Sequence, residues 1–161
     1  MIKLYRYDIA ELPHSAAEAS NVRHEAGLRL IKQAAAELCG VKEPVILRTE
    51  AGKPYFKDIP LKFSVSHSGR CVILAVSDRE IGADVQYMAE RSLDIAKRYF
   101  TDKEREYVGG DIIRFYEIWT KKEAYAKWDG RGFALARSID VTNLVFYTEN
   151  DGQYALAVYE K

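Results

Sequence analysis

The sequence contains little cysteine. Its two cysteines, Cys39 and Cys71, lie far apart, form no C-x-x-C pair and have no histidine at the spacing of a zinc site. Structural zinc sites and the disulfide frameworks of small secreted domains both need clustered cysteines. The pattern therefore argues against both and favours a reduced protein, which we expect to be cytoplasmic.

An excess of charge of one sign and long apolar segments are also absent. The 24 Lys and Arg residues balance 24 Asp and Glu residues, so the charge does not favour nucleic acid or a membrane surface as a partner. No segment approaches the roughly 20 apolar residues of a membrane span, and the first residues lack a signal-peptide core. We expect a soluble globular protein, because 161 residues that are 48% hydrophobic can bury a sizeable core.

The N-terminal part of the chain combines one long helix with several strands. Ser15 and Glu18 form a capping box that predicts a helix to Leu38, with Gly40 just past its end. Alternating or apolar segments predict strands at residues 2–9, 44–50, 61–68, 71–77 and 80–87. The Gly- and Pro-containing segment 51–60 is interpreted as a loop, and the last three strands as an antiparallel meander.

The C-terminal part becomes helical after Ser92. Thr101 and Glu104 form a second capping box, residues 111–128 form a long helix that ends near Gly130, and an Asn-Asp-Gly turn predicts a hairpin over residues 138–161. Mixed helices and strands with short links indicate an α+β fold with antiparallel sheets, in two packed halves that meet near residue 85.

Glu123 lies on the apolar side of the helix predicted at 111–128. At about 100° per residue it falls among Ile112, Phe115, Tyr116 and Trp119, whereas the opposite side carries Arg114, Glu117, Thr120 and Lys121. Burial of an unpaired carboxylate costs several kcal/mol or more of folding free energy, and a cation beside it could offset this cost. Glu123 could pair with Lys127 one turn later, for about 0.2–0.5 kcal/mol, or it could meet a cation from elsewhere.

Asp84 raises the same question on the strand at 80–87. Side chains alternate along a strand, so Gly82, Asp84 and Gln86 share one face. Asp84 could simply face water at an edge. One Mg²⁺ ion would instead explain Asp84 and Glu123 together, because proteins often hold Mg²⁺ by one or two carboxylates plus substrate phosphates.

Three motifs resemble a known family. FSVSHSG at 63–69, IGADVQ at 81–86 and WTKKEAYAK at 119–127 resemble, in this order and spacing, the 4'-phosphopantetheinyl transferase superfamily in its larger, pseudo-dimeric, surfactin-synthetase-activating type. With the Gly-Lys-Pro loop, the match runs from Gly52 to Phe133. The resemblance implies one α+β domain, 1–161, of two similar halves at about 1–84 and 85–161. Each half would be an antiparallel sheet with a packed helix, and a pseudo-twofold would relate the two.

The resemblance also implies a reaction. The protein, expected to be a monomer, would transfer 4'-phosphopantetheine from coenzyme A to a serine of an apo acyl or peptidyl carrier protein, leaving adenosine 3',5'-bisphosphate. The carriers would serve fatty-acid, polyketide or nonribosomal peptide synthesis. Asp84 and Glu123 would hold Mg²⁺, or Mn²⁺ in its place, against the pyrophosphate of coenzyme A, and Lys127 would lie by the phosphates.

Further roles follow from the same resemblance. Lys53, Ser66 and His67 would hold the 3'-phosphate end of coenzyme A, and the general base would be Glu104 or Glu123. Local alternatives stay open, because Glu104 could act only as a cap, His67 as a core histidine and Lys53 as a solvated loop residue.

The sequence departs from the family pattern in two places that affect the site. Gln86 stands where many members have glutamate, although its carbonyl oxygen could still reach a metal. The N-terminal arginine contact to coenzyme A has no clear counterpart, and Arg23 and Arg29 are both candidates. The main rival is a protein that binds coenzyme A or a carrier without transfer, but the presence of both acids favours the enzyme. A purely structural module would leave Glu123 without a partner.

Overall fold

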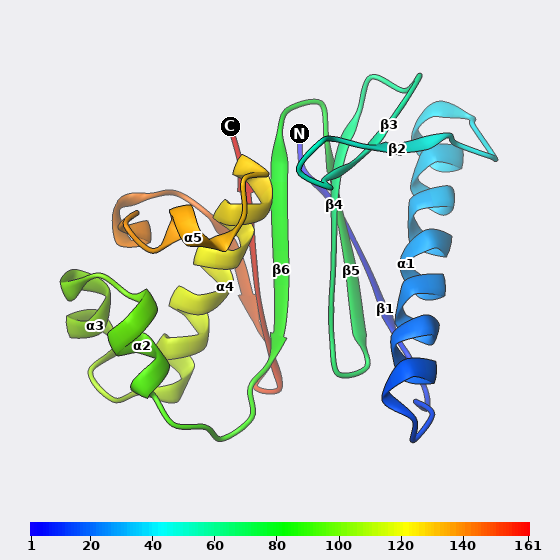
Figure 1. Ribbon diagram of the computed structural model, residues 1–161. Coiled ribbons are helices and arrows are strands. Elements are labelled where there is room, and N and C mark those ends of the chain that lie inside the picture. Colours follow the sequence, from blue (N-terminus) through cyan, green and yellow to red (C-terminus); the bar gives the residue numbers. More distant parts are fainter.

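Antiparallel sheets and two long helices make up the fold. The computed structural model describes the backbone of residues 1–161 and every side chain except that of Leu135. It confirms the α+β class, and Figure 1 shows these elements: β1 (Lys3–Asp8), α1 (Ala16–Cys39), β2 (Ile46–Arg48), β3 (Pro54–Phe56), β4 (Lys62–Ser68), β5 (Cys71–Ser77), β6 (Ile81–Tyr87), α2 (Asp94–Tyr99), α3 (Asp102–Val108), α4 (Ile112–Asp129), α5 (Phe133–Ala136), η1 (Val141–Asn143), β7 (Tyr147–Asn150) and β8 (Tyr154–Glu160).

The layers run from α1 through two sheets to α4 (Figure 1). One face of the sheet β1-β5-β4 packs on α1, through residues such as Leu30, Phe63 and Leu74. Its other face meets the sheet β6-β8-β7 in a second apolar cluster that includes Ile73 and Val85. The far face of that second sheet packs on α4. Each sheet thus has one long helix on its outer side, as the resemblance implied.

The long helices begin and end where their caps predict. Ser15 Oγ accepts a hydrogen bond from the N–H of Glu18, and Gly40 ends α1 in the left-handed conformation at a φ of 70°. Asp111 caps the start of α4, and Gly130 ends it in the same way as Gly40 ends α1. None of the described helices has both the length and the apolar character that crossing a membrane requires.

The predicted meander is wrong in its third strand. β4 and β5 pair as expected, but β6 pairs with β8 in the other sheet. The reason is that β5 has β1 on one edge and β4 on the other, so it offers β6 no free edge. The sheets therefore divide between Ser77 and Ile81, whereas the division into halves at residues 84 and 85 stays a prediction.

Two further expectations need correction. The segment 51–60 is not all loop, because Pro54–Phe56 form β3 opposite β2. Within 138–161 only Tyr147–Asn150 and Tyr154–Glu160 are strands, since a 3₁₀ turn occupies Val141–Asn143.

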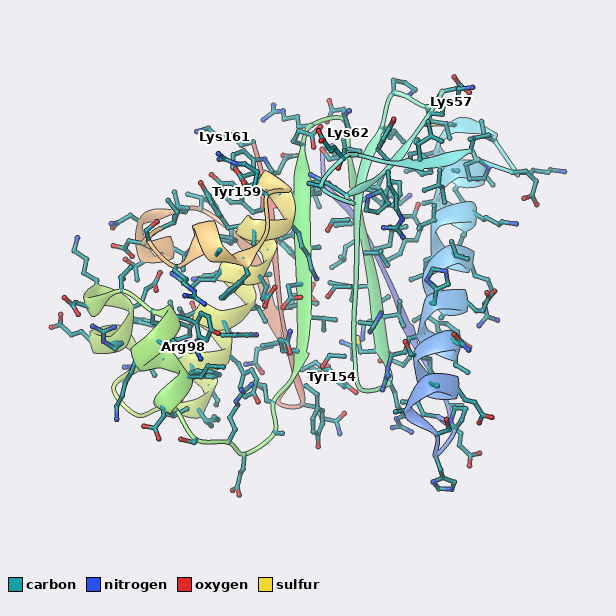
Figure 2. All side chains as sticks on the ribbon, viewed as in Figure 1. Lys57, Lys62, Arg98, Tyr154, Tyr159 and Lys161 are labelled. Carbon is teal, nitrogen blue, oxygen red and sulfur yellow. The ribbon has the colours of Figure 1, made fainter. Side chains whose placement is uncertain are left out.

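Gly82 sets the distance between β6 and α4. A Cβ atom at this position would lie 2.0 Å from the carbonyl oxygen of Ala124 and 2.3 Å from the backbone nitrogen of Trp128. The backbones of strand and helix are therefore in direct contact, which only glycine permits. Near the C-terminal end of α4, Trp128 packs against Tyr159 of β8, which Figure 2 labels, with 5.1 Å between the ring centroids.

Candidate active site

Asp84 is the most enclosed acid of the site. It lies on β6 with 2% of its surface exposed, and its Oδ1 accepts hydrogen bonds from Lys127 Nζ at 2.7 Å and Ser66 Oγ at 2.9 Å. Its Oδ2 accepts a third from Gln86 Nε2 at 2.9 Å. The strand face shared by Asp84 and Gln86 is thus turned toward α4, and Asp84 is not an acid in open water.

Glu123 is brought to the same place by α4, but its carboxylate has no partner. Lys127 forms its ion pair with Asp84, and among the described side chains none makes a hydrogen bond or ion pair with Glu123. The alternative of a local pair between Glu123 and Lys127 is therefore wrong. Burial, and next the negative charge of Asp84, raise the pKa of Glu123 to about 7, while Lys127 acts in the opposite direction.

Two adjoining cavities meet at these residues. They measure about 470 and 380 Å³, and both are lined by Arg48, Pro54, Val65, Glu123 and Lys127. The first extends between the Gly-Lys-Pro loop and the segment that follows α4, and the second extends between α1 and β4 to Asp84 and Gln86. Pockets of 300–1,000 Å³ are typical of small-molecule sites. The arrangement forms a cleft between the two long helices.

Basic side chains, His24, Arg48, His67 and Lys127, line the second cavity together with the acids. His67 is exposed and lines the second cavity, so the alternative of a core histidine is wrong. Loss of water contact and then the positive charges of Arg23 and Lys127 lower the pKa of His67. Like charges placed together in this way suit an anionic ligand.

Lys53 of the Gly-Lys-Pro loop is not a solvated loop residue. Its side chain is 17% exposed, and its Nζ donates to the carbonyl oxygen of Trp128 at 2.9 Å and pairs with Glu80 at 3.0 Å. These contacts fasten the loop to the C-terminal end of α4, where a cation is favourable. Lys53 also lines the first cavity, so it is placed to contact a ligand there.

Of the two candidate arginines on α1, the structure brings only Arg23 near the site. Arg29 is exposed, stacks on Tyr7 of β1 with 5.4 Å from guanidinium to ring, and lines neither cavity. It lies on the β1 side of the helix, so the geometry does not favour its contact to coenzyme A, which stays a prediction. Arg23 donates to the carbonyl oxygen of Gly69 at 2.7 Å, beside His67.

Glu104 is buried in a different part of the molecule. It and Lys122 are both 0% exposed, and Lys122 Nζ donates to the two carboxylate oxygens at 2.9 and 2.8 Å. Glu104 also accepts the N–H groups of Thr101 and Val141, which confirms the capping box. A carboxylate so enclosed, lining neither cavity, is not placed to reach a substrate hydroxyl, so the geometry favours Glu104 as a cap and its role as general base stays an untested prediction.

Arg48 and Lys122 are important residues that the sequence did not reveal. Arg48 lines both cavities because β2 pairs with β3 and brings it opposite Pro54. The only signal was its place in a short strand before the Gly-Lys-Pro loop. Lys122 is part of the WTKKEAYAK motif, but its pairing could not be predicted, since its partner Glu104 lies on another helix.

The donor set around Asp84 and Glu123 suits a hard divalent cation. Among the described side chains no group of three or more His, Cys, Asp or Glu residues could hold a metal. Mg²⁺, however, usually takes one or two carboxylates and completes its shell with water and phosphate oxygens. The unpartnered carboxylate of Glu123 beside that of Asp84 fits such a site.

We expect the metal-free protein to lose stability as the pH rises from about 5 to about 7. Unfolded glutamate titrates near 4.5 and folded Glu123 near 7, so in this window only the folded state keeps the proton. Above pH 7 the loss is complete. In thermal unfolding with a chelator present, Glu123→Gln should have a higher melting temperature than wild type at pH 8. This difference in melting temperature should disappear toward pH 5. A difference independent of pH would contradict the raised pKa.

Comparison with known proteins agrees with the geometry. The family model described as the 4'-phosphopantetheinyl transferase superfamily matches residues 80–161. A 4'-phosphopantetheinyl transferase of Bacillus subtilis is 36% identical over 117 residues, which are 68% of this chain and 52% of the relative. The 4'-phosphopantetheinyl transferase AcpT of Salmonella typhi is 32% identical over 143 residues, which are 83% of this chain and 70% of the relative.

A third relative, the 4'-phosphopantetheinyl transferase gsp of Aneurinibacillus migulanus, is 32% identical over 125 residues. The matched part of this chain spans about half the length of several of these curated relatives. The family match nevertheless includes β6 and α4, which carry Asp84 and Glu123. The chain belongs to the 4'-phosphopantetheinyl transferase superfamily.

Proposed function

We propose that this protein transfers 4'-phosphopantetheine from coenzyme A to a serine of an apo acyl or peptidyl carrier protein, in a reaction that depends on Mg²⁺. The observation that carries the proposal is the convergence of Asp84, Glu123 and Lys127 on a cleft that basic side chains such as Arg48 and His67 also line. Such a cleft suits a ligand with several phosphates and a metal ion between them. The named relatives support the same reaction. The two free cysteines of this protein fit a location in the reducing cytoplasm, which we include in the proposal.

Asp84 and Glu123 would hold the metal, and Lys127 would lie beside the phosphates. When bound, Mg²⁺ supplies positive charge that offsets the charge developing on the pyrophosphate as its bond to the transferred group breaks. Lys127 adds a second positive charge to the same wall, because its ammonium group already lies 2.7 Å from Asp84. Arg23, Arg48, Lys53 and His67 would bind the remaining phosphate groups of coenzyme A.

Glu123 is also our candidate for the general base. The attacking serine hydroxyl on the carrier must lose its proton near the phosphorus, and a base works best when its pKa lies near the working pH. Without a metal the pKa of Glu123 is about 7, and bound Mg²⁺ would lower it and keep the carboxylate ionised, ready to accept a proton. Its lack of a hydrogen-bond partner leaves its oxygens able to accept the proton.

The test is a transfer assay read by intact mass. The protein is mixed with a panel of apo carrier proteins, coenzyme A and Mg²⁺, and we expect at least one carrier to gain a single phosphopantetheine group. Omission of Mg²⁺ or addition of chelator should stop the reaction. Binding of coenzyme A without modification of any carrier would contradict the proposal and favour a binding protein.

Replacement of Gln86 by glutamate is expected to strengthen metal binding. Gln86 donates to Asp84 and lines the second cavity, so Gln86→Glu would place a further negative charge beside the metal. We expect Mg²⁺ affinity to rise by about tenfold, which corresponds to about 1.4 kcal/mol. The affinity can be measured by calorimetry, with Gln153→Glu at the β7–β8 turn as a charge-matched control. An unchanged Mg²⁺ affinity would place Gln86 outside the metal site.

A further inference from the structure

A row of serine hydroxyls joins the two main sheets. Ser64, Ser66 and Ser68 of β4 accept hydrogen bonds from the N–H groups of Ala83, Val85 and Tyr87 of β6, at 3.0, 3.3 and 2.9 Å. We call these three serines the serine seam. Each serine pairs with the residue 19 positions later, so β4 and β6 run in the same direction. The serine seam takes the place of backbone-to-backbone hydrogen bonds between β4 and β6, and it gives N–H groups at the edge of β6 a hydrogen-bond acceptor.

Ser66 differs from the other two serines because it also contacts the candidate active site. Its hydroxyl lies 2.9 Å from Asp84 Oδ1 and 2.9 Å from Lys127 Nζ, and the residue is only 5% exposed. No described site contact of this kind is made by Ser64 or Ser68. One atom of β4 thus connects the seam to both charged groups.

The hydrogen-bonding capacity of a hydroxyl fixes the direction of each bond. A serine hydroxyl has one proton to donate and two lone pairs that accept. Lys127 and the N–H of Val85 can only donate, so they occupy the two lone pairs. The single proton of Ser66 must then point to the carboxylate of Asp84.

This arrangement changes the role predicted for Ser66. With its donor and both lone pairs in use, the hydroxyl has no proton left in this arrangement for a phosphate oxygen of coenzyme A, and the contact of Ser66 with coenzyme A stays a prediction. The same bonds hold Oδ1 of Asp84 and the ammonium group of Lys127 in a closed triangle, since those two groups lie 2.7 Å apart. We propose that Ser66 is a positioning residue that orients Asp84 and Lys127 for metal binding and transfer.

The inference rests on the proposed function, but it can be tested separately through metal binding. Hydrogen-bonding neighbours of metal ligands typically change metal affinity or activity by about 10–100-fold when they are removed. We therefore expect Ser66→Ala to weaken binding of Mn²⁺, a paramagnetic probe in place of Mg²⁺, by about tenfold or more in the absence of coenzyme A. Electron paramagnetic resonance measures this directly. We expect kcat for transfer to fall by about as much, with KM for coenzyme A within about twofold of wild type.

Two further variants make the test specific. Ser68→Ala removes a bond of the same seam but touches neither Asp84 nor Lys127, so we expect Mn²⁺ affinity and kcat close to wild type. Ser66→Thr keeps the hydroxyl and should restore both. If Ser66→Ala does not fold, Ser66→Cys takes its place, because a thiol is a weak donor of similar shape.

The possible outcomes separate the two proposals. A wild-type protein that modifies no carrier contradicts the proposed function, whereas weaker Mn²⁺ binding by Ser66→Ala than by Ser68→Ala still supports the positioning role. Equal Mn²⁺ affinity in these two variants overturns it. A raised KM for coenzyme A with unchanged kcat also overturns it, because the hydroxyl would then bind the coenzyme.

Discussion

Asp84→Asn is expected to reduce carrier modification by about a thousandfold or more while leaving the fold intact. Asparagine has the shape of aspartate, so β6 can keep its packing, but it removes the negative charge that would face both the metal and Lys127. Loss of a single group that stabilises charge in a transition state typically costs 10²–10³ in rate. Loss of a metal ligand should cost at least as much. Initial rates at increasing Mg²⁺ concentration measure the effect.

A surface aspartate provides the control for this prediction. Asp94 at the start of α2 is exposed and pairs with Lys97 at 2.9 Å. Asp94→Asn removes the same charge outside the cleft, so we expect its rate to stay within about twofold of wild type. Full activity of Asp84→Asn would refute the metal assignment. If a higher Mg²⁺ concentration restored the rate of this variant, the substitution would have weakened metal binding.

Local chemistry made the helices and the acid pair predictable from the sequence. A capping serine and a terminal glycine act within a few residues, so Ser15 and Gly40 were sufficient to place α1. The side-chain period of a strand likewise put Asp84 and Gln86 on one face, and the helical period set Glu123 among apolar neighbours. These predictions depend only on near neighbours in the chain.

Contacts between distant segments could not be read in the same way. Periodicity placed Thr120 on the solvent side of α4, yet it is buried, because this side of the helix packs on the second sheet, near Ala155 and Leu156 of β8. Lys127 could reach Asp84 instead of Glu123 only because Gly82 lets β6 approach α4 so closely. Arg48 lines the cleft because β2 pairs with β3, and this pairing could not be predicted from the sequence.

Adjacent residues of α4 therefore serve different purposes. Lys122 points into the buried ion pair with Glu104, whereas Glu123 lies on the wall of both cavities. Lys122 Nζ also donates to the carbonyl oxygen of Ile139 at 2.8 Å, and Glu104 accepts the N–H of Val141. The pair thus holds α3, α4 and the segment after α5 together, behind the helix face that carries the site.

Glu104→Gln is expected to destabilise the protein by about 3–5 kcal/mol, the usual cost of removing one partner of a buried ion pair. The ammonium group of Lys122 would be left without its counter-charge. Burial already lowers the pKa of Lys122 against the opposing effect of Glu104, so loss of Glu104 should lower it further. The destabilisation should then be largest near neutral pH and shrink as the pH rises toward 10, because a neutral lysine is less costly to bury. Urea unfolding at several pH values measures this directly.

A second ion pair on α4 supplies the matched control. Glu117 and Lys121 lie one turn apart with 2.7 Å between the charged atoms, and both keep contact with solvent. Glu117→Gln should cost clearly less than Glu104→Gln, because this pair is only partly buried, so a large difference between the variants would reflect burial. If Glu104→Gln kept wild-type stability but lost transfer activity, Glu104 would act in catalysis and its assignment as a structural residue would be wrong. A stability loss with kcat retained in the folded fraction is the result that we expect, because Glu104 lines neither cavity.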